Sequence, residues 1–515
     1  VLVSTHVSGN KAWRAFFGIV TAVSFLFLIV ISMQDIWFVL AGILGIFGVY
    51  SWFAQARDGV EHSVMKRLVQ PALWILIALS AFLFGWFNVW VHDRLPEKMQ
   101  IVAVEVRPSW EGTFSVGQNS LTNSRALLFG TGPNSFARNW AQFKPEGVNE
   151  TLFWNLDFNN GVGAVPTSFV TIGTIGIAAW ILIALAFLWA AGEALRREKL
   201  FGSAQTITFG IVCAILYLLA FHVMYAPGLA ISVLLFVLLG ILVVHIVGEK
   251  KSILPLNLDS LPKLAGVVVA LVLTVGTFVA SATSLLALAS DMYVNHSVAL
   301  FNRDGGIGAS TAVIQKALML WPSNDRAHRA AVELGILELA QLGEKANTDE
   351  AARAQLEGTL SQTIEHGLQA VSIDRADYQN WLTLAQLYQE LAGVGIEGAY
   401  EQAQQAYTTA REENPTNPLP LFRLAQLEVL KGNTSNAIDL FAEAITLKRD
   451  FAPAYFVRSQ LLAQQNRLEE AIASAAPAVQ LVPDDPLGWY NLGVILYLNG
   501  SFNEAGAAFA QAVNL

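Results

Sequence analysis

The pattern of apolar and polar positions divides this chain into two parts near residue 290. Before that point, long apolar runs alternate with short polar breaks, and about 20 apolar residues are enough for a helix to cross a bilayer. After it, apolar residues recur at helical spacing among many charged ones. The sequence predicts seven membrane spans, at about residues 15–33, 36–54, 71–92, 166–191, 205–224, 227–248 and 264–289.

Basic residues in the breaks predict the orientation of these spans. Lys11 and Arg14 precede the first span, and Lys or Arg stands in every second break after it. The breaks at residues 34–35 and 226–227 contain neither. Since basic breaks stay on the cytoplasmic side, we expect the loop at 93–165 and everything after the seventh span to lie outside.

The second part repeats with a period near 34 residues, which is typical of solenoids built from helix pairs. Small residues at fixed positions let two antiparallel helices approach, and large ones fill the space between neighbouring pairs. The pattern resembles the tetratricopeptide repeat, and a generic helical bundle is the alternative. The repeated positions are clearest in Trp489, Leu492, Gly493, Leu496, Ala505, Phe509 and Ala512, and in Leu421, Leu424, Ala425, Ala437, Phe441 and Ala444.

These two parts predict an all-α protein. Residues 1–289 form a polytopic transmembrane helix bundle, and residues 290–515 form an external tetratricopeptide-type α-solenoid that binds a protein or peptide partner. Both ends look cut, because Val1 is not a start methionine and Leu515 stops inside a repeat helix. We therefore expect a fragment of a longer protein.

Composition agrees with a protein that lies largely in lipid. Of 515 residues, 54% are hydrophobic and 14% are charged, whereas soluble domains carry about a quarter charged residues. The net charge of −9 argues against a nucleic-acid partner, which needs a basic surface. The single cysteine, Cys213, excludes an intramolecular disulfide.

The predicted external loop carries the chemistry-bearing motifs. It contains Arg107-x-x-Trp110 and the run LFGTGPNSF at 128–136, and TIGTIG at 171–176 follows at the start of the next span. With STHVSGNKAW at 4–13, these motifs resemble the signature of the O-antigen ligase and polymerase superfamily over about residues 1–250. The resemblance implies a GT-C-like membrane fold and several further spans upstream of Val1.

The resemblance also implies an activity. Members of this family transfer a glycan from a polyprenyl-pyrophosphate carrier to an acceptor hydroxyl outside the cytoplasmic membrane of a prokaryote, with no metal and no other cofactor. Such a site needs cations for the pyrophosphate and a base for the acceptor proton. Arg107 matches the family's loop arginine, whose planar fork suits pyrophosphate oxygens.

The base is where this chain departs from the family. The family's histidine position is occupied here by Asn159-Asn160-Gly, and no histidine lies between Asp93 and Pro166. His92 and His222 stand at span ends, where a histidine is more often interfacial. Asp157 is the nearest carboxylate, so we predict it as the substitute catalytic base, although an Asp in such a turn usually caps backbone amides.

Other loop residues are candidates for substrate binding. Aromatic faces can stack on a sugar ring and basic or amide groups can bind its polar groups, but the same residues also suit a membrane interface or an exposed surface. These candidates are Trp110, Arg125, Arg138, Trp154, Asn159 and Asn160.

Two functions remain open from the sequence. The first is an envelope glycosyltransferase of the ligase or polymerase type, which the retained Arg107 and the long loop favour. The second is a non-catalytic ligase-like membrane scaffold whose external repeats bind protein partners, which the absent histidine favours.

Overall fold

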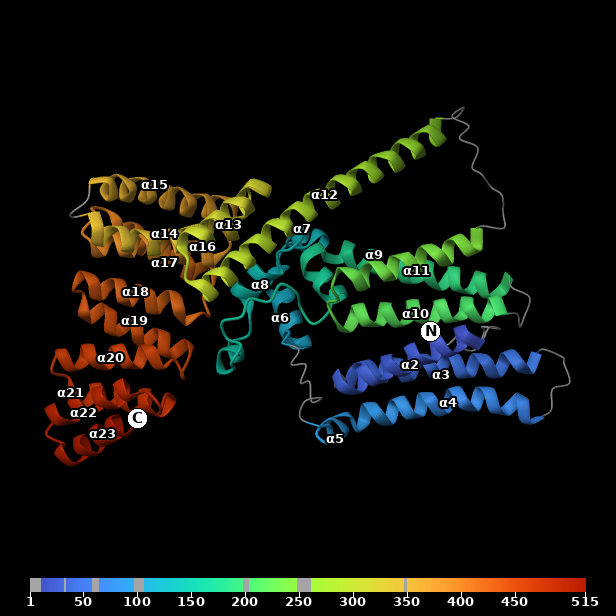
Figure 1. The fold of residues 1–515 in the computed structure, drawn as a ribbon, viewed down its shortest axis with the longest axis horizontal. Coiled ribbons are helices and arrows are strands. Elements are labelled where there is room, and N and C mark those ends of the chain that lie inside the picture. Colours follow the sequence, from blue (N-terminus) through green and yellow to red (C-terminus); the bar gives the residue numbers. More distant parts are fainter. Residues whose placement is uncertain are drawn as a thin grey trace. The chain divides into compact units, whose positions relative to one another are not determined.

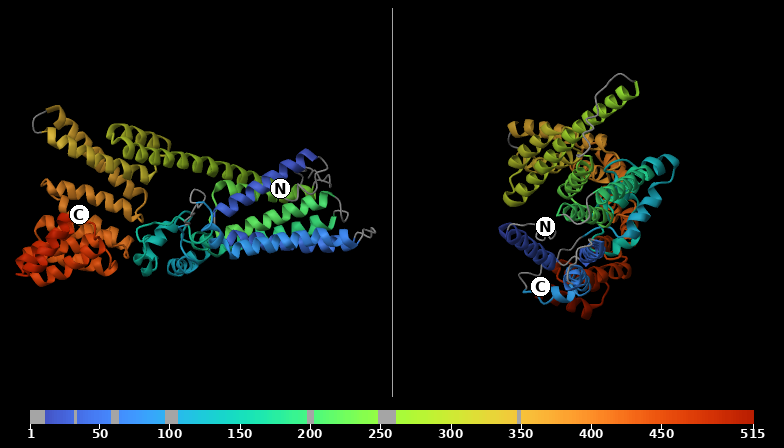
Figure 2. Two further views of the ribbon diagram at one scale, coloured as in Figure 1. Left: turned by 60° about the horizontal axis from the view of Figure 1, so that its bottom comes forward. Right: turned by 90° about the vertical axis from the view of Figure 1, so that its right-hand side faces the viewer.

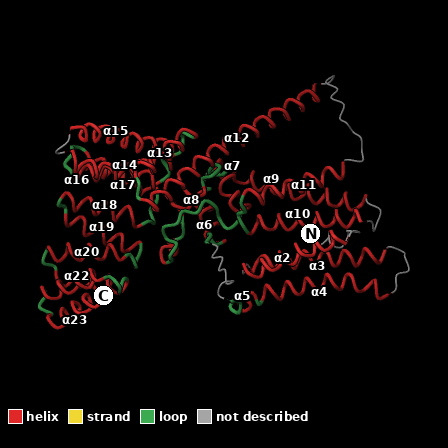
Figure 3. The backbone as a smooth tube through the Cα atoms, viewed as in Figure 1, coloured by secondary structure: helices red, strands yellow, loops and turns green. Residues whose placement is uncertain are grey.

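The computed structural model describes residues 11–31, 34–57, 64–96, 106–197, 203–247, 261–346 and 350–515. These ranges consist of helices, turns and loops, and no strand occurs within them (Figures 1, 2 and 3). The chain divides into two compact units. The first comprises residues 1–137 and 158–255, and the second comprises residues 138–157 and 256–515.

The first unit contains six apolar helices and most of the loop elements. In chain order its elements are α2 (Lys11–Ile31), α3 (Gln34–Arg57), α4 (Val64–Trp86), α5 (Asn88–His92), α6 (Trp110–Ser120), α7 (Ser124–Phe129), the start of α8 (Phe136–Phe143), α9 (Ala164–Arg197), α10 (Ser203–Met224) and α11 (Leu229–Val247).

The second unit contains the rest of α8, the short helix η2 (Glu146–Glu150) and all later helices. These are α12 (Leu261–Asp304), α13 (Ile307–Leu320), α14 (Asp325–Ala346), α15 (Glu350–Ile373), α16 (Tyr378–Gly393), α17 (Ala399–Glu413), α18 (Pro418–Lys431), α19 (Thr434–Leu447), α20 (Ala452–Gln464), α21 (Leu468–Leu481), α22 (Pro486–Leu498) and α23 (Phe502–Asn514).

Each predicted span coincides with an apolar helix. Helices α2, α9, α10, α11 and α12 are long and apolar enough to cross a membrane, and α3 and α4 carry shorter apolar stretches. The third predicted span is divided, because α4 ends at Trp86 and α5 begins at Asn88. Large apolar side chains such as Leu182, Val244 and Phe278 are exposed on these helices, as expected for surfaces that contact lipid. The chain is a multi-pass membrane protein.

The boundary predicted at 289/290 falls inside one helix. Helix α12 runs without interruption from Leu261 to Asp304, so the last apolar span continues directly into the repeats. Its final turns pack against α13, where the Ser290 hydroxyl donates to the Ala317 carbonyl at 2.8 Å. The second unit therefore begins with a span rather than after it.

The later helices pair and stack as the period predicts (Figures 1 and 2). Helices α18, α20 and α22 begin 34 residues apart, and the insertion near 393–398 lengthens the preceding repeat. Small residues are buried where partner helices meet, including Ala385, Ala425 and Gly493. A Cβ on Gly493 would lie 2.7 Å from the Phe509 ring, which shows how closely that pair approaches.

Candidate functional site

The two glycine motifs meet in the first unit. Gly130 follows α7 with φ 72° and ψ −168°, and Gly173 interrupts α9 with φ 73° and ψ −159°, a conformation open essentially to glycine. A Cβ on Gly173 would lie 2.5 Å from the Gly130 nitrogen. Two loop amides bond to the kinked helix, from Thr131 to the Val170 carbonyl at 3.1 Å and from Gly132 to the Thr171 carbonyl at 2.9 Å. The loop is therefore fastened to α9 where α9 bends.

The Gly42–Gly45 pair in α3 does not mark a close contact between helices. Gly42 and Gly45 in α3 could let two spans pack closely, but a Cβ on either would meet nothing within 4 Å. Close approaches occur instead at Gly130 with Gly173, and between α3 and α4 at Gly48 and Gly85, where a Cβ would lie 3.1 Å from the Ile75 side chain and 3.0 Å from the Phe38 ring.

Arg107 contacts three other segments of the first unit. Its Nη1 donates to the carbonyl of Val162 at 2.8 Å and to the carbonyl of Met224, the last residue of α10. Its Nη2 lies 3.6 Å from the carboxylate of Asp35, at the start of α3. Its guanidinium carbon lies 4.1 Å from the ring centroid of Tyr225. The arginine side chain is 24% exposed, so one side of it remains accessible to solvent.

Asp35 and Tyr225 are parts of this site that sequence reasoning missed. The Tyr225 hydroxyl donates to Asp35 Oδ2 at 3.3 Å, so the carboxylate has both a neutral and a cationic neighbour. The sequence signal was available, because Asp35 is an acidic residue in a break without Lys or Arg. From the sequence, the lack of Lys and Arg in that break predicts only the orientation of the spans.

The turn at the family's histidine position is held firmly against its surroundings. The Val162 amide donates to Thr113 Oγ1 at 2.8 Å, and the Gly161 amide donates to Thr167 Oγ1 at 2.9 Å. A Cβ on Gly163 would lie 2.1 Å from the Val223 carbonyl oxygen, so this position requires glycine. Arg107 thus binds directly to a rigid turn.

Neither nearby histidine reaches that turn through a hydrogen bond. His222 is buried in α10, with Nδ1 2.7 Å from the Leu218 carbonyl and Nε2 3.2 Å from the Ser232 hydroxyl. His92 is buried in α5, and within the described ranges neither of its ring nitrogens has a hydrogen-bond partner.

The predicted substrate-binding residues fall into both units. Trp110, Arg125, Asn159 and Asn160 are exposed in the first unit, and Trp110 stacks on Phe114 with a centroid distance of 6.0 Å. Arg138, Trp154 and Asp157 belong to the second unit. The structure therefore does not bring the two predicted catalytic residues, Arg107 and Asp157, into one unit.

Asp157 is bound to the repeats. Its carboxylate accepts from the Tyr378 hydroxyl at 3.0 Å and from Gln379 Nε2 at 2.6 Å. Burial raises the pKa of Asp157, and these two hydrogen bonds oppose that rise. Arg138 pairs with Asp374 at 2.9 Å, a contact between half-exposed and mostly buried groups.

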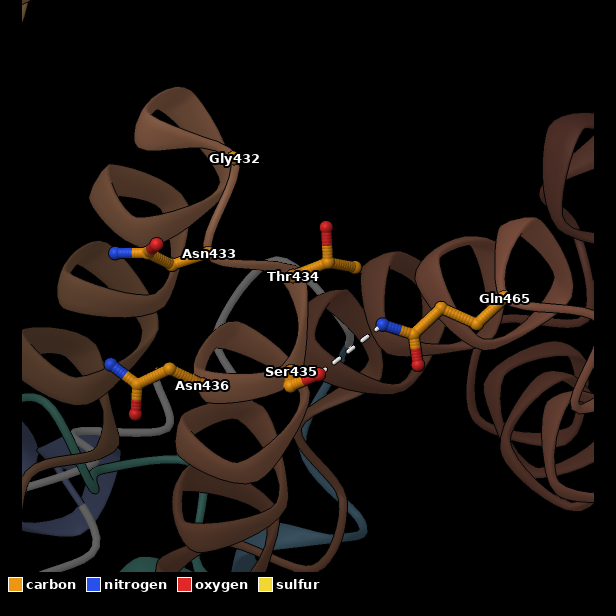
Figure 4. A pocket seen from close by; sticks show the side chains of 6 residues that line it. All are labelled: Gly432, Asn433, Thr434, Ser435, Asn436 and Gln465. Carbon is orange, nitrogen blue, oxygen red and sulfur yellow. Dashed lines mark hydrogen bonds between the residues drawn. The ribbon is translucent and has the colours of Figure 1, made fainter.

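Two further kinds of candidate site are a metal site and a cavity for a small ligand. Within the described ranges, no three His, Cys, Asp or Glu residues lie close enough to hold a metal ion. A cavity of about 440 Å³ lies beside the α18–α19 turn, and Figure 4 shows Gln465 directed toward Ser435 there. It offers amides and hydroxyls without a charged or aromatic group, and its lining residues are Gly432, Asn433, Thr434, Ser435, Asn436 and Gln465.

Comparison with known families identifies the repeats. Family models described as "Tetratricopeptide repeat" match residues 396–461 and 456–514. Residues 396–514 form tetratricopeptide repeats. The fold class expected from the sequence, an all-helical membrane protein with such a solenoid, is confirmed. Tetratricopeptide repeats typically present a surface for protein or peptide partners.

Two curated relatives share part of the sequence. The human "Protein O-mannosyl-transferase TMTC1" is 28% identical over 208 residues, which cover 36% of this chain and 23% of that protein. Its mouse counterpart is 26% identical over 150 residues, covering 28% of this chain and 15% of that protein. The chain thus matches about a quarter or less of the length of these relatives.

Solved structures that resemble this chain cover less than half of it. A structure titled "Functional Characterization of Pseudomonas Aeruginosa pilF" has a TM-score of 0.34, 15% identity, and covers 43% of this chain and 90% of that one. "Crystal structure of YrrB: a TPR protein with an unusual peptide-binding site" has a TM-score of 0.28, 16% identity, and covers 39% and 91%.

Proposed function

We propose that this protein is a membrane glycosyltransferase that carries a tetratricopeptide-repeat domain. The observation that carries the proposal is the convergence around Arg107: the arginine binds the turn at the family's histidine position through Val162, in the same unit as the Gly130–Gly173 junction. Three of the motifs that resemble the O-antigen ligase and polymerase superfamily, at 107–110, 128–136 and 171–176, therefore belong to one unit, and most of the fourth, at 4–13, lies outside the described residues. The mannosyl-transferase name of the curated relatives supports a glycosyl donor.

The proposed reaction follows that family. The donor is a glycan on a polyprenyl pyrophosphate, and the acceptor is a hydroxyl on the external side of a prokaryotic cytoplasmic membrane. The acceptor oxygen bonds to the anomeric carbon, the bond from that carbon to the pyrophosphate oxygen breaks, and its electron pair leaves on the pyrophosphate. Arg107 stabilises this growing charge through its guanidinium group, whose side chain is 24% exposed.

Two carboxylates are candidates to accept the proton of the acceptor. Asp157 was the candidate from sequence, but its carboxylate already accepts two hydrogen bonds from the repeats. Asp35 lies 3.6 Å from Arg107 and has a half-exposed side chain. We favour Asp35, because it belongs to the same unit as Arg107 and a base must lie within hydrogen-bond reach of the reacting hydroxyl.

A second function is favoured by one observation. Arg107 Nη1 is occupied by two backbone carbonyls, which is also what a purely structural arginine would do. With the family histidine absent, the alternative is a non-catalytic ligase-like scaffold whose external repeats bind protein partners.

Transfer of a lipid-linked glycan by the full chain in membrane vesicles tests the proposal. Arg107→Ala should lower transfer by roughly 100- to 1000-fold, and Arg107→Lys should restore only part of it, because an ammonium cannot make two parallel bonds. Arg94→Ala, an arginine of the same unit that stacks on Trp90, serves as the matched control.

The two carboxylates are separated in the same assay. Asp35→Asn should slow transfer by roughly 100-fold or more if Asp35 is the base, whereas Asp157→Asn should have that effect if the sequence prediction holds. Full activity in Arg107→Ala leaves the scaffold function standing.

A further inference from the structure

Residues 138–157, which we call the loop strap, come from the external loop but belong to the repeat unit. On both sides of the strap the chain belongs to the first unit, which holds the LFGTGPNSF motif before it and the Asn159–Gly163 turn after it. The strap is therefore covalently continuous at both ends with loop segments of the first unit, and the second of these contains Val162, which Arg107 binds.

The centre of the strap is fixed by Asn149. This side chain is 3% exposed, and its amide donates to the carbonyls of Thr416 at 2.7 Å and Leu447 at 3.0 Å. In return, Lys448 Nζ donates to the Asn149 carbonyl at 2.8 Å. Thr416 lies in the α17–α18 connection and Leu447 is the last residue of α19, so one residue of the strap binds two successive repeats.

The two ends of the strap bind further repeats. Asp157 accepts from Tyr378 and Gln379 at the start of α16, as described above. Ala141 is buried in one cluster with Tyr378 and Ala410. Trp154 packs edge-on against Phe451, with ring centroids 5.7 Å apart. The contacts thus extend from the start of α16 past the α17–α18 connection to the α19–α20 connection.

Two buried lysines hold the strap, one from within it and one from the repeats. Lys144 and Lys448 are 5% and 6% exposed, and each places its ammonium group on a carbonyl of the strap. Burial lowers the pKa of Lys144 to about 8. Lys448 also pairs with Asp450 at 2.6 Å. An ammonium group so deeply buried needs its acceptors, and Lys448 takes one of them from the strap, whereas Lys144 and Trp154 both belong to the strap.

We propose that this row of helix ends and connections is a binding surface for the chain's own loop strap, and that the repeats thereby position the two loop segments that flank the strap, one of which Arg107 binds. Asn149, Lys448 and Asp157 are positioning residues in this arrangement. The catalytic consequence rests on the proposed function, whereas the positioning itself does not.

Amide hydrogen exchange of the full chain in lipid nanodiscs tests the positioning directly. Asn149→Asp turns a double donor into a carboxylate facing two carbonyls, and Lys448→Met removes the ammonium at similar length. Both should raise exchange in the strap by roughly 10- to 100-fold. Both should also raise exchange of the Thr131, Gly132 and Val162 amides in the first unit. Lys431→Met is the matched control, since Lys431 stacks on Tyr400 in the same solenoid, away from the strap.

The outcomes are decisive. Unchanged strap exchange in both variants overturns the docking surface, and a released strap with unchanged first-unit amides overturns the positioning. Slow exchange of the Ala437 and Ala471 amides reports an intact solenoid. If Asn149→Asp unfolds it, replacing residues 145–153 by a Gly/Ser segment of equal length makes the same test without altering the repeats. If the wild-type chain transfers no glycan, the proposed function fails while exchange still decides the positioning.

Discussion

Replacing Gly173 by alanine should separate the external loop from α9. Gly173 has φ 73° and ψ −159°, and a conformation of this kind costs a non-glycine residue about 1–3 kcal/mol. The new Cβ would also lie 2.5 Å from the Gly130 nitrogen and 2.6 Å from the Leu128 carbonyl oxygen. Both contacts are with backbone, so the overlap cannot be relieved by turning a side chain, and a further 1–3 kcal/mol is expected.

The summed free-energy cost destabilises the contact between the loop and α9 rather than the fold of the whole chain. The loop can move off the helix, which breaks the bonds from Thr131 to Val170 and from Gly132 to Thr171. A local cost of about 2–6 kcal/mol corresponds to an opening equilibrium raised by roughly 30- to 20,000-fold. Exchange of the Thr131 and Gly132 amides measures this equilibrium directly.

A matched control separates the junction from a general effect of alanine in an apolar helix. Gly45→Ala in α3 adds the same methyl group where nothing lies within 4 Å, so we expect no loss of stability. Alanine is also the better helix former there. Equal exchange of Thr131 and Gly132 in Gly173→Ala and in the wild type would refute the reasoning, because it would mean that the loop does not rest on α9.

The remaining predictions concern the repeats and the topology. Gly493→Ala should lower the free energy of unfolding of the repeats by about 1–3 kcal/mol, because its Cβ would lie 2.7 Å from the Phe509 ring, and chemical denaturation measures this. Burial lowers the pKa of Lys144 from 10.5 to about 8, so between these pH values the unfolded chain binds more protons than the folded chain. The free energy of unfolding of the wild type should therefore rise from pH 8 to 10.5, and Lys144→Met should lack this rise. Cysteines at Asn134 and Asn433 should both react with an impermeant reagent in intact cells, and reaction of one alone contradicts the shared external side.

The sequence by itself determined the helices and their grouping. Local sequence patterns predict membrane helices and repeats, since about 20 consecutive apolar residues suffice for a span and a 34-residue period suffices for helix pairs. The pattern located Ala425 and Gly493 at helix contacts, and both are buried. A local pattern also pointed to the glycine motifs, because few residues other than glycine can occupy such backbone positions.

Tertiary structure decided which of these pieces meet. Arg107 binds Val162, Met224 and Asp35, and the separation between Arg107 and Met224 is 117 residues, so no local pattern could pair them. The Asp157 prediction relied on closeness in sequence to a missing histidine, but the folded chain places its carboxylate on Tyr378, 221 residues away.

The loop strap is the clearest case. In the sequence, Asn149 is one amide in a polar loop, and its burial depends on carbonyls 267 and 298 residues further along the chain. Backbone carbonyls have no side-chain identity, so the partners of such an amide leave no trace in the residue types. Only the stacking of repeats, which brings Thr416 and Leu447 together, creates the position that Asn149 fills.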